Sequence, residues 1–170
     1  MGEMKNDIEA SIQNFKDTKS KINFLLQLSR NADEKTKKFL NNRLEELYIQ
    51  HYKENSDNPQ RAIEFYASLG KKEAGRIAEM FKKYKDPSMA SYILKKIGDY
   101  SGARKIWLEL NIPQMVAMTY EDQAEVEENK RKRKEYFLKA AEIWRKTGDL
   151  EKAKRNYRKA GWIEFLKSKF

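Results

Sequence analysis

The chain has 170 residues, of which 39% are hydrophobic, 12% aromatic and 36% charged, and its formal net charge at pH 7 is +10. It has no cysteine and one histidine, His51, which excludes thiolate catalysis, disulfides, iron–sulfur clusters, histidine-rich metal sites and paired-histidine acid–base chemistry. Valine occurs twice and threonine four times, too few for a sheet protein, whereas Lys, Glu, Leu, Ala and Arg are abundant. This composition predicts an all-α fold.

Two helices are predicted first, over residues 4–29 and 32–54. Apolar side chains recur at three- and four-residue steps along both, although Lys19 interrupts the first stripe. The link between the helices is short, so we expect an antiparallel helical hairpin that forms a first domain over residues 1–56. His51 lies on the apolar face of the second helix, and we expect a structural role for it because a lone imidazole lacks partners for metal binding or catalysis.

Helix-breaking residues then recur at nearly regular intervals. Pro59, Pro87 and Pro113 are 28 and 26 residues apart, and Gly70 and Gly98 are again 28 apart. Each proline suits the first turn of a helix, and each glycine suits the turn that ends one. Near-periodic helix pairs, none of which can bury its apolar face alone, are typical of an α-solenoid. We therefore predict a helical-repeat domain after the hairpin.

The most regular pair has a signature centred on Gly148. Small and aromatic residues flank this glycine at fixed offsets: Phe137, Ala140, Ala141, Trp144, Ala153, Tyr157 and Ala160. In this pattern the segment resembles a tetratricopeptide repeat (TPR), most strongly over residues 134–167, with weaker copies around Gly70 and Gly98. The resemblance implies a TPR-like α-solenoid of helix pairs, stacked in a right-handed sense, over residues 57–170.

The TPR resemblance also bears on function, because TPR folds bind proteins and are rarely catalytic. It therefore implies a non-enzymatic interaction protein. The best-known TPR site is a clamp of Lys, Asn and Arg that holds the terminal carboxylate of a peptide. Four residues of the strong repeat are expected to face the groove: Glu135, Leu138, Glu142 and Arg145. Two of them are acids, so we expect that clamp to be absent.

Residues 114–147 contain neither glycine nor proline and leave two alternatives open. One continuous helix would keep the final pair in phase with the pairs before it, and would place Glu127 and Arg131 in favourable i,i+4 order. A break is favoured by residues 127–135, which have no apolar face. The phase argument favours the continuous helix.

A group of four acids precedes the basic region: Glu121, Asp122, Glu125 and Glu128. Three of them share one helical face, as in carboxylate metal sites. Because no histidine and no second ligand helix accompany them, a salt-bridged solvent face is the preferred interpretation. No metal ion and no other cofactor is predicted.

The positive charge is concentrated towards the C-terminal end. Residues 1–129 carry equal numbers of basic and acidic side chains, whereas residues 130–170 carry fifteen basic and five acidic ones. Such a basic region either meets an anionic partner or serves only as a solvated face that keeps the protein soluble. The predicted partner-binding residues are Lys130, Arg131, Lys132, Arg133, Lys134, Arg145, Lys152, Lys154, Arg155, Arg158 and Lys159.

Two functions are compatible with these features. The first is a scaffold protein that docks an acidic partner through its basic C-terminal helices. The second is an RNA- or ribosome-associated factor that places the same basic end on phosphates. Trp162, Phe165 and Phe170 could stack on bases, although capping of the last helix pair by Trp162 and Phe165 is the preferred interpretation. Self-association through the N-terminal hairpin is a further expectation, and no small-molecule substrate is expected.

Location and source are inferred from the same sequence. The longest apolar run, Met115–Met118, is too short to span a membrane, and residues 1–10 are too polar for a signal peptide, so cytoplasmic localisation is expected. Abundant Lys and Glu without cysteine favour a thermophilic source.

Overall fold

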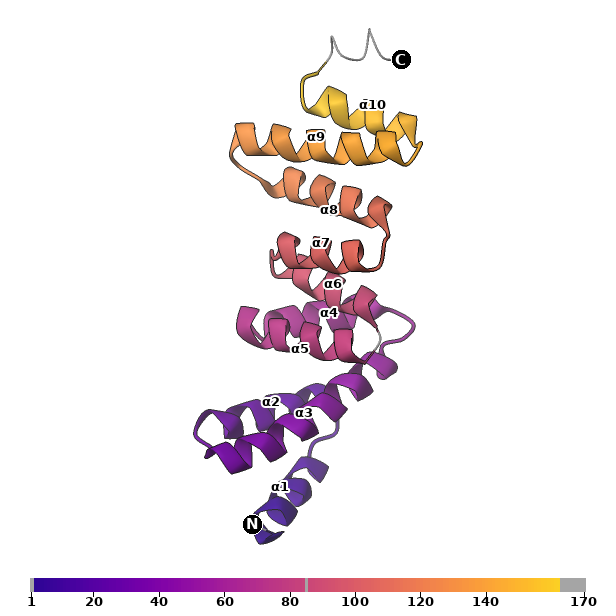
Figure 1. Cartoon of the computed structure of the whole chain (residues 1–170). Coiled ribbons are helices and arrows are strands. Elements are labelled where there is room, and N and C mark those ends of the chain that lie inside the picture. The colour runs from indigo at the N-terminus through magenta and orange to yellow at the C-terminus, as the bar shows by residue number, and fades with distance from the viewer. Residues whose placement is uncertain (1, 85, 163–170) are drawn as a thin grey trace. The chain divides into compact units, whose positions relative to one another are not determined.

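The computed structural model describes residues 2–84 and 86–162. Within these residues the chain forms ten α-helices and no strand, and the helices pack mostly on those that precede or follow them in sequence (Figure 1). The predicted all-α fold, with the sequential packing of a helical repeat, is confirmed.

The chain divides into two compact units, Met1–Ser68 and Leu69–Phe170. The described part of the first unit contains α1 (Gly2–Gln13), α2 (Thr18–Arg30), α3 (Glu34–Glu54) and α4 (Pro59–Ser68). The described part of the second contains α5 (Lys71–Lys83), α6 (Pro87–Lys96), α7 (Tyr100–Glu109), α8 (Pro113–Val126), α9 (Lys130–Lys146) and α10 (Leu150–Lys159). The division lies one helix later than the domain boundary expected at residues 56–57.

The prediction of one helix over residues 4–29 is wrong, because the structure breaks this segment into α1 and α2. Asp17 has an extended backbone, and its Oδ1 accepts a hydrogen bond from the N–H of Ser20 at 2.9 Å. An aspartate that caps a new helix in this way competes with continuation of the previous one. The new start also places Thr18 where its hydroxyl donates to Glu54 Oε1 of α3 at 2.8 Å.

The expected antiparallel hairpin is formed by α2 and α3. The link is short because Asp33 caps α3 and accepts a hydrogen bond from the N–H of Thr36 at 2.7 Å. A salt bridge between Glu9 of α1 and Arg43 of α3, at 3.1 Å, connects the first helix to the hairpin. The apolar stripes of α2 and α3 are buried at Ile22, Leu25, Leu40, Leu44 and Leu47.

His51 lies in the packing of α3 on α4 and is only 2% exposed. Its Nδ1 lies 3.3 Å from the hydroxyl of Tyr66, which itself donates to the Tyr48 carbonyl at 2.6 Å. The imidazole also contacts the ring of Phe65, with centroids 4.8 Å apart. The hydroxyl proton of Tyr66 is committed to Tyr48, so the Nδ1–H of a neutral His51 is the donor in the first contact. His51 therefore joins two helices of the first unit.

In the second unit each helix from α5 to α10 packs on the next. Three of these helices begin with the same kind of N-cap. The side chains of Asp86, Asp99 and Asp149 each accept a hydrogen bond from the N–H three residues later. The turns before α7 and α10 contain Gly98 and Gly148, whose φ values of +83° and +87° favour glycine. Gly98 of the periodic pair and Gly148 of the TPR-like signature thus lie in equivalent turns.

The favoured continuous helix over residues 114–147 is wrong, because the chain reverses between α8 and α9. Glu127 has an extended backbone, and Asn129 caps α9 by accepting from the N–H groups of Arg131 and Lys132 at 3.0 and 3.1 Å. The i,i+4 pair expected between Glu127 and Arg131 is absent from this arrangement. The asparagine cap decides the break because it satisfies two N–H groups at once.

Burial also favours the reversal. When α9 turns back along α8, Ala117 of α8 packs in one buried cluster with Ala140 and Trp144 of α9. Seven residues further along α8, Ala124 packs with Phe137 in a second cluster. A single projecting helix would leave these apolar faces in water. Consequently α9 contacts α8 on one side and α10 on the other.

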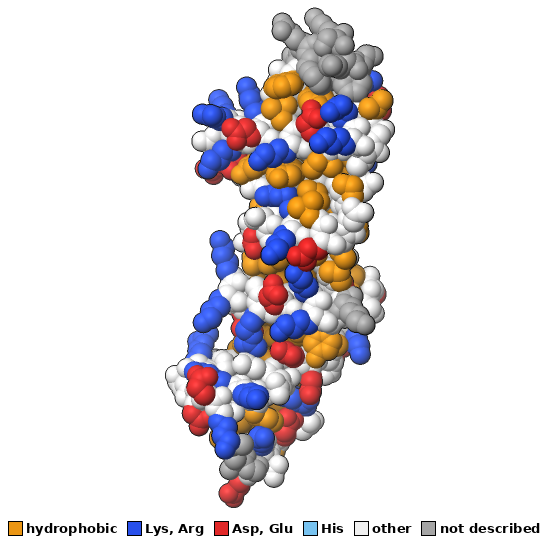
Figure 2. Space-filling view, in the orientation of Figure 1, with side chains coloured by type: hydrophobic (Ala, Val, Ile, Leu, Met, Phe, Trp, Pro, Cys, Tyr) orange, Lys and Arg blue, Asp and Glu red, His pale blue; other side chains and the backbone are white. Residues whose placement is uncertain are grey.

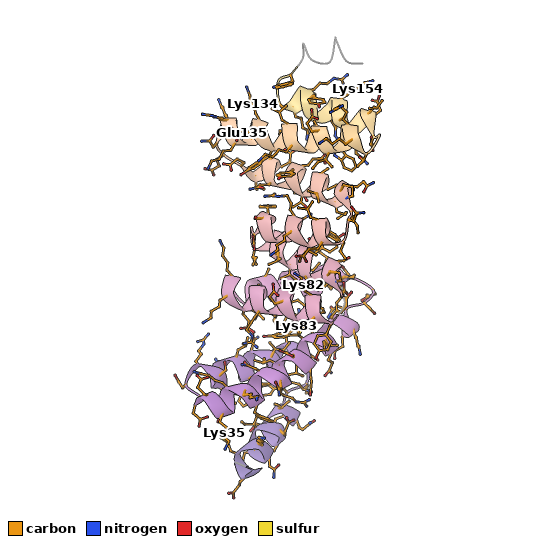
Figure 3. The ribbon with its side chains drawn as sticks, viewed as in Figure 1. Lys35, Lys82, Lys83, Lys134, Glu135 and Lys154 are labelled. Atoms are coloured by element: carbon orange, nitrogen blue, oxygen red, sulfur yellow. The ribbon has the colours of Figure 1, made fainter. Side chains whose placement is uncertain are left out.

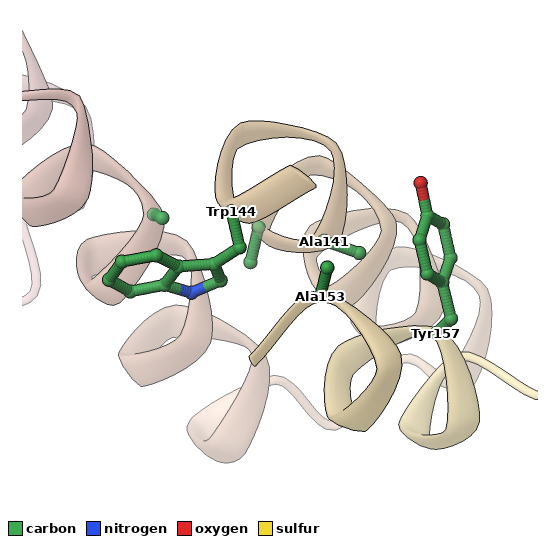
Figure 4. Packing of buried hydrophobic residues seen from close by; sticks show 6 residues of the cluster. Ala141, Trp144, Ala153 and Tyr157 are labelled. Carbon is green, nitrogen blue, oxygen red and sulfur yellow. The ribbon is translucent and has the colours of Figure 1, made fainter. Parts of the chain in front are cut away.

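The residues of the TPR-like signature meet between α9 and α10. Ala141 and Ala153 are fully buried where the two helices approach, and Figure 4 shows Trp144 and Tyr157 on either side of this contact. Larger side chains at the two alanines would hold the helices apart. This small-to-small contact sets the position of the surface formed by α8, α9 and α10.

Candidate interaction surface on helices α8 to α10

Glu121 is the centre of a hydrogen-bond network that joins three helices. Its carboxylate accepts from Trp144 Nε1 of α9 at 2.8 Å and from Asn156 Nδ2 of α10, and it pairs with Arg155 Nη2 at 3.4 Å. The side chain is 19% exposed. In the sequence Glu121 stands in the acidic group, but no local pattern indicates its partners, which lie more than twenty residues away.

Two further acids of the same group also form ion pairs. Asp122 pairs with Lys95 of α6, and Glu125 pairs with Lys159 of α10. Within the part of the chain that the structure describes, no three acidic or histidine side chains converge as metal ligands would. Glu121, Asp122 and Glu125 thus connect α8 electrostatically to α6 and α10.

Most of the predicted partner-binding cations already have partners within the chain. Arg155 and Lys159 pair with α8, and Arg133 Nε donates to the carbonyl of Glu127 at 2.8 Å. The local ion pairs are Arg131–Glu135, Arg145–Glu142, Lys152–Asp149 and Lys154–Glu151. These local pairs have i,i+3 or i,i+4 spacing, so the sequence contained a signal for them.

Four of the eleven predicted cations have side chains that form neither an ion pair nor a hydrogen bond with the described residues, and all four are exposed: Lys130, Lys132, Lys134 and Arg158. Three of them belong to the first two turns of α9. Figure 3 places Lys134 and Glu135 near the start of α9 and Lys154 near the start of α10, at opposite ends of this helix pair. In Figure 2 basic side chains gather at the α9 start, with acidic ones among them.

The start of α9 is electrostatically unusual. Its first five residues are basic and its first turn has no acid, although the N-terminus of a helix carries partial positive charge. Like charges at this end oppose helix formation, so these side chains do not stabilise α9. An anion at this end would be attracted both by the side chains and by the helix terminus.

A shallow groove of about 380 Å³ lies between α8 and α9. It is lined by Tyr120 of α8 and by Leu138, Lys139, Glu142 and Ile143 of α9. Leu138 and Glu142 were expected to face a groove. Of the other two expected residues, Glu135 pairs with Arg131, and Arg145 pairs with Glu142 at 2.9 Å.

Glu142 is held as a carboxylate within this groove. The hydroxyl of Tyr157 donates to its Oε1 while Arg145 pairs with its Oε2, and together these contacts hold the pKa of Glu142 below its usual value. Burial and the adjacent Glu142 raise the pKa of Tyr157 to about 12. Both oxygens of the lining acid are therefore engaged by side chains of the protein.

Cations and aromatic rings surround the groove. Arg104 Cζ of α7 lies 4.2 Å from the ring centroid of Tyr120, and Lys139 Nζ lies 5.6 and 5.8 Å from the centroids of Tyr120 and Tyr136. The two tyrosine rings stack with centroids 6.2 Å apart. No sequence pattern indicated these four residues, because Tyr120 and Tyr136 come together only through the reversal between α8 and α9.

Trp162 follows α10 and stacks on Tyr157, with ring centroids 6.2 Å apart. Its residue exposure is 45%, so it covers the last pair only in part. This position agrees with the preferred capping interpretation for Trp162. Phe165 and Phe170 lie outside the described residues.

Comparison of the chain with protein-family models, curated proteins and solved structures finds no match. Among the described helices, none combines the length and apolar character that crossing a bilayer requires.

Proposed function

We propose that this protein is a non-enzymatic, TPR-like interaction scaffold that docks an acidic partner protein through the basic end of its second unit. The observation that carries the proposal is the unpaired cation set at the start of α9, Lys130, Lys132 and Lys134. These residues oppose the helix dipole and form no ion pair with the described residues, so folding does not account for them.

The TPR-like part of the proposal is supported by the packing around the signature residues. Ala141 and Ala153 form a close contact between α9 and α10, and the helices of the unit follow one another in a stack. Stacked helix pairs leave a long surface exposed, and proteins built in this way commonly use that surface for binding. Inferring function from the fold alone is an analogy, so the unpaired cations of α9 support the proposal more strongly than the fold does.

RNA binding is the second candidate, and one observation favours it. Trp162 is about half exposed at the end of α10, a helix that presents Arg158 to solvent. Bases can stack on such an indole while nearby cations meet phosphates. However, the ring of Trp162 already stacks on Tyr157, so an acidic protein surface is the first candidate.

The experiment screens two randomised libraries against the full chain in parallel, one of displayed peptides and one of single-stranded RNA. We expect enriched peptides that are rich in Asp and Glu and whose affinity falls with salt. Enrichment of RNA alone, with log affinity falling by about 0.7 per log unit of salt for each phosphate contacted, would replace the first candidate by the second.

Charge reversal then locates the site. The α9 triple variant carries Lys130→Glu, Lys132→Glu and Lys134→Glu. Its affinity for the selected acidic peptides is expected to fall roughly tenfold or more. The matched control reverses three exposed cations of α5 and therefore changes net charge equally: Lys71→Glu, Lys72→Glu and Lys83→Glu. Equal loss in both variants would show that only the total charge matters, and the proposal would fail.

A further inference from the structure

We infer that the groove between α8 and α9 receives an apolar side chain from a protein segment that also carries a carboxylate next to that side chain. The inference rests on the proposed interaction function, because it names the kind of segment that the acidic partner supplies. It assigns recognition to residues other than Lys130, Lys132 and Lys134, namely Leu138, Ile143, Lys139 and Arg104.

The floor of the groove is apolar and firmly supported. Leu138 and Ile143 are partly buried and pack on a cluster whose members, including Ala140 and Trp144, are almost completely buried. The volume of about 380 Å³ is at the lower end of the range for ligand pockets, so it suits one or two apolar side chains. A supported floor lowers the ordering cost of binding.

The charge of the groove selects an acidic neighbour for that apolar side chain. Lys139 lines the groove and Arg104 contacts its Tyr120 wall, and neither forms a salt bridge with the described residues. Arg104 Nη1 instead donates to the neutral Gln123 Oε1 at 2.6 Å. Glu142, the acid of the lining, has both oxygens engaged by Tyr157 and Arg145. The groove therefore presents cations that a carboxylate from outside can pair with.

An RNA base is a poorer occupant of this groove than an acidic protein segment. The lining residues Leu138 and Ile143 are aliphatic, whereas base recognition uses exposed aromatic faces. The aromatic wall, Tyr120, already carries Arg104 over its ring and stacks with Tyr136. Charge complementarity and the aliphatic floor together favour a segment in which Leu, Ile or Phe stands beside Asp or Glu.

The test uses the peptides selected from the random library on the full chain. We expect them to share an apolar residue within a few positions of an acid. Lys139→Glu is expected to reduce the affinity for these peptides roughly tenfold. A peptide in which the adjacent acid is replaced by Lys should bind this variant better than it binds the wild type. Lys139 is exposed, so the substitution should preserve the fold, as checked by circular dichroism. Lys72→Glu is the matched control, because Lys72 is also exposed and lies outside the groove.

The outcomes separate this inference from the proposed function. If Lys139→Glu and Lys72→Glu bind the peptides equally, or if the selected peptides lack the shared apolar residue, the groove inference is overturned. The proposed function survives that result whenever the α9 triple variant still loses binding relative to the α5 control. If no acidic peptide is enriched at all, both ideas fail together.

Discussion

Single side chains connect the helices of the second unit, and Glu121 is the clearest case. Removing its carboxylate would leave Trp144 Nε1 and Asn156 Nδ2 without the acceptor they share, and both of these residues are almost fully buried. We predict that Glu121→Ala lowers the free energy of unfolding by about 1–3 kcal/mol, the usual cost of unsatisfied buried polar groups.

Urea-induced unfolding measures this effect. Glu125→Ala is the matched control, because Glu125 makes a single ion pair and its side chain is 58% exposed. Its loss should cost little. Equal effects of the two substitutions would show that Glu121 does not organise the three helices.

His51 makes the stability of the protein depend on pH. Burial first, and then the positive charge of Lys19, lower the pKa of His51 from its usual value near 6.5, while Glu54 and Asp17 act in the opposite direction. Because the unfolded state binds a proton more readily, the free energy of unfolding falls as the pH drops below about 6.5 and levels off only below the folded-state pKa.

We predict that His51→Gln flattens this dependence between pH 7 and pH 5 without altering binding. Unfolding of the wild type and the variant at a series of pH values checks it, since the two carry identical carboxylates. Parallel curves would show that His51 titrates alike in the folded and unfolded states.

At the scale of the helices, the sequence was most informative where local chemistry decides the structure. The glycine turns, the proline starts and the small residues of α9 and α10 are local signals, and they led to the right elements. The break at Asp17 was missed, and the break at Asn129 was considered but not favoured. Both are helix caps, and each needs tertiary burial to prevail over a helical pattern that continues on both sides.

The close contact of α9 and α10 gives a direct test of their packing. Ala141 and Ala153 are fully buried in it, so Ala141→Leu or Ala153→Leu should lower the free energy of unfolding by roughly 1–3 kcal/mol through overpacking. Lys146→Leu on the exposed side of α9 is the control in the same unfolding experiment. Unchanged stability in both alanine variants would contradict this packing.

The candidate site was predictable only in part, because it depends on contacts between residues that are far apart in the sequence. Its basic residues were visible in the sequence, yet the pairing of Arg155 with Glu121 and of Lys159 with Glu125 across helices was not. Tyr120 comes to line the groove with α9, and to stack on Tyr136, only because the chain reverses between the two tyrosines. The ion pair between Arg155 and Glu121 also decides where charge reversal can test partner binding. Arg155→Glu would place a carboxylate beside Glu121 and disturb folding, so Lys130, Lys132 and Lys134 are better sites for this test.

For the whole molecule, the central claim is that the cations at the start of α9 are present for a partner and not for the fold. The two roles predict changes of opposite sign. Replacing Lys130, Lys132 and Lys134 by Glu puts acids at the positive end of a helix dipole, which should raise Tm by about 1–3 °C. The same change should remove attraction for an acidic partner.

The most direct test measures Tm and the affinity for the selected acidic peptide on the same samples of the α9 triple variant, the α5 control and the wild type. The account predicts that the α9 variant melts higher than the wild type. It also predicts that this variant, unlike the α5 control, binds at least roughly tenfold more weakly at about 0.05 M salt, and that the binding difference shrinks at about 1 M, where the Debye length is about 3 Å. An α9 variant that binds as tightly as the wild type at low salt would contradict the account and leave the basic end as a solubilising face.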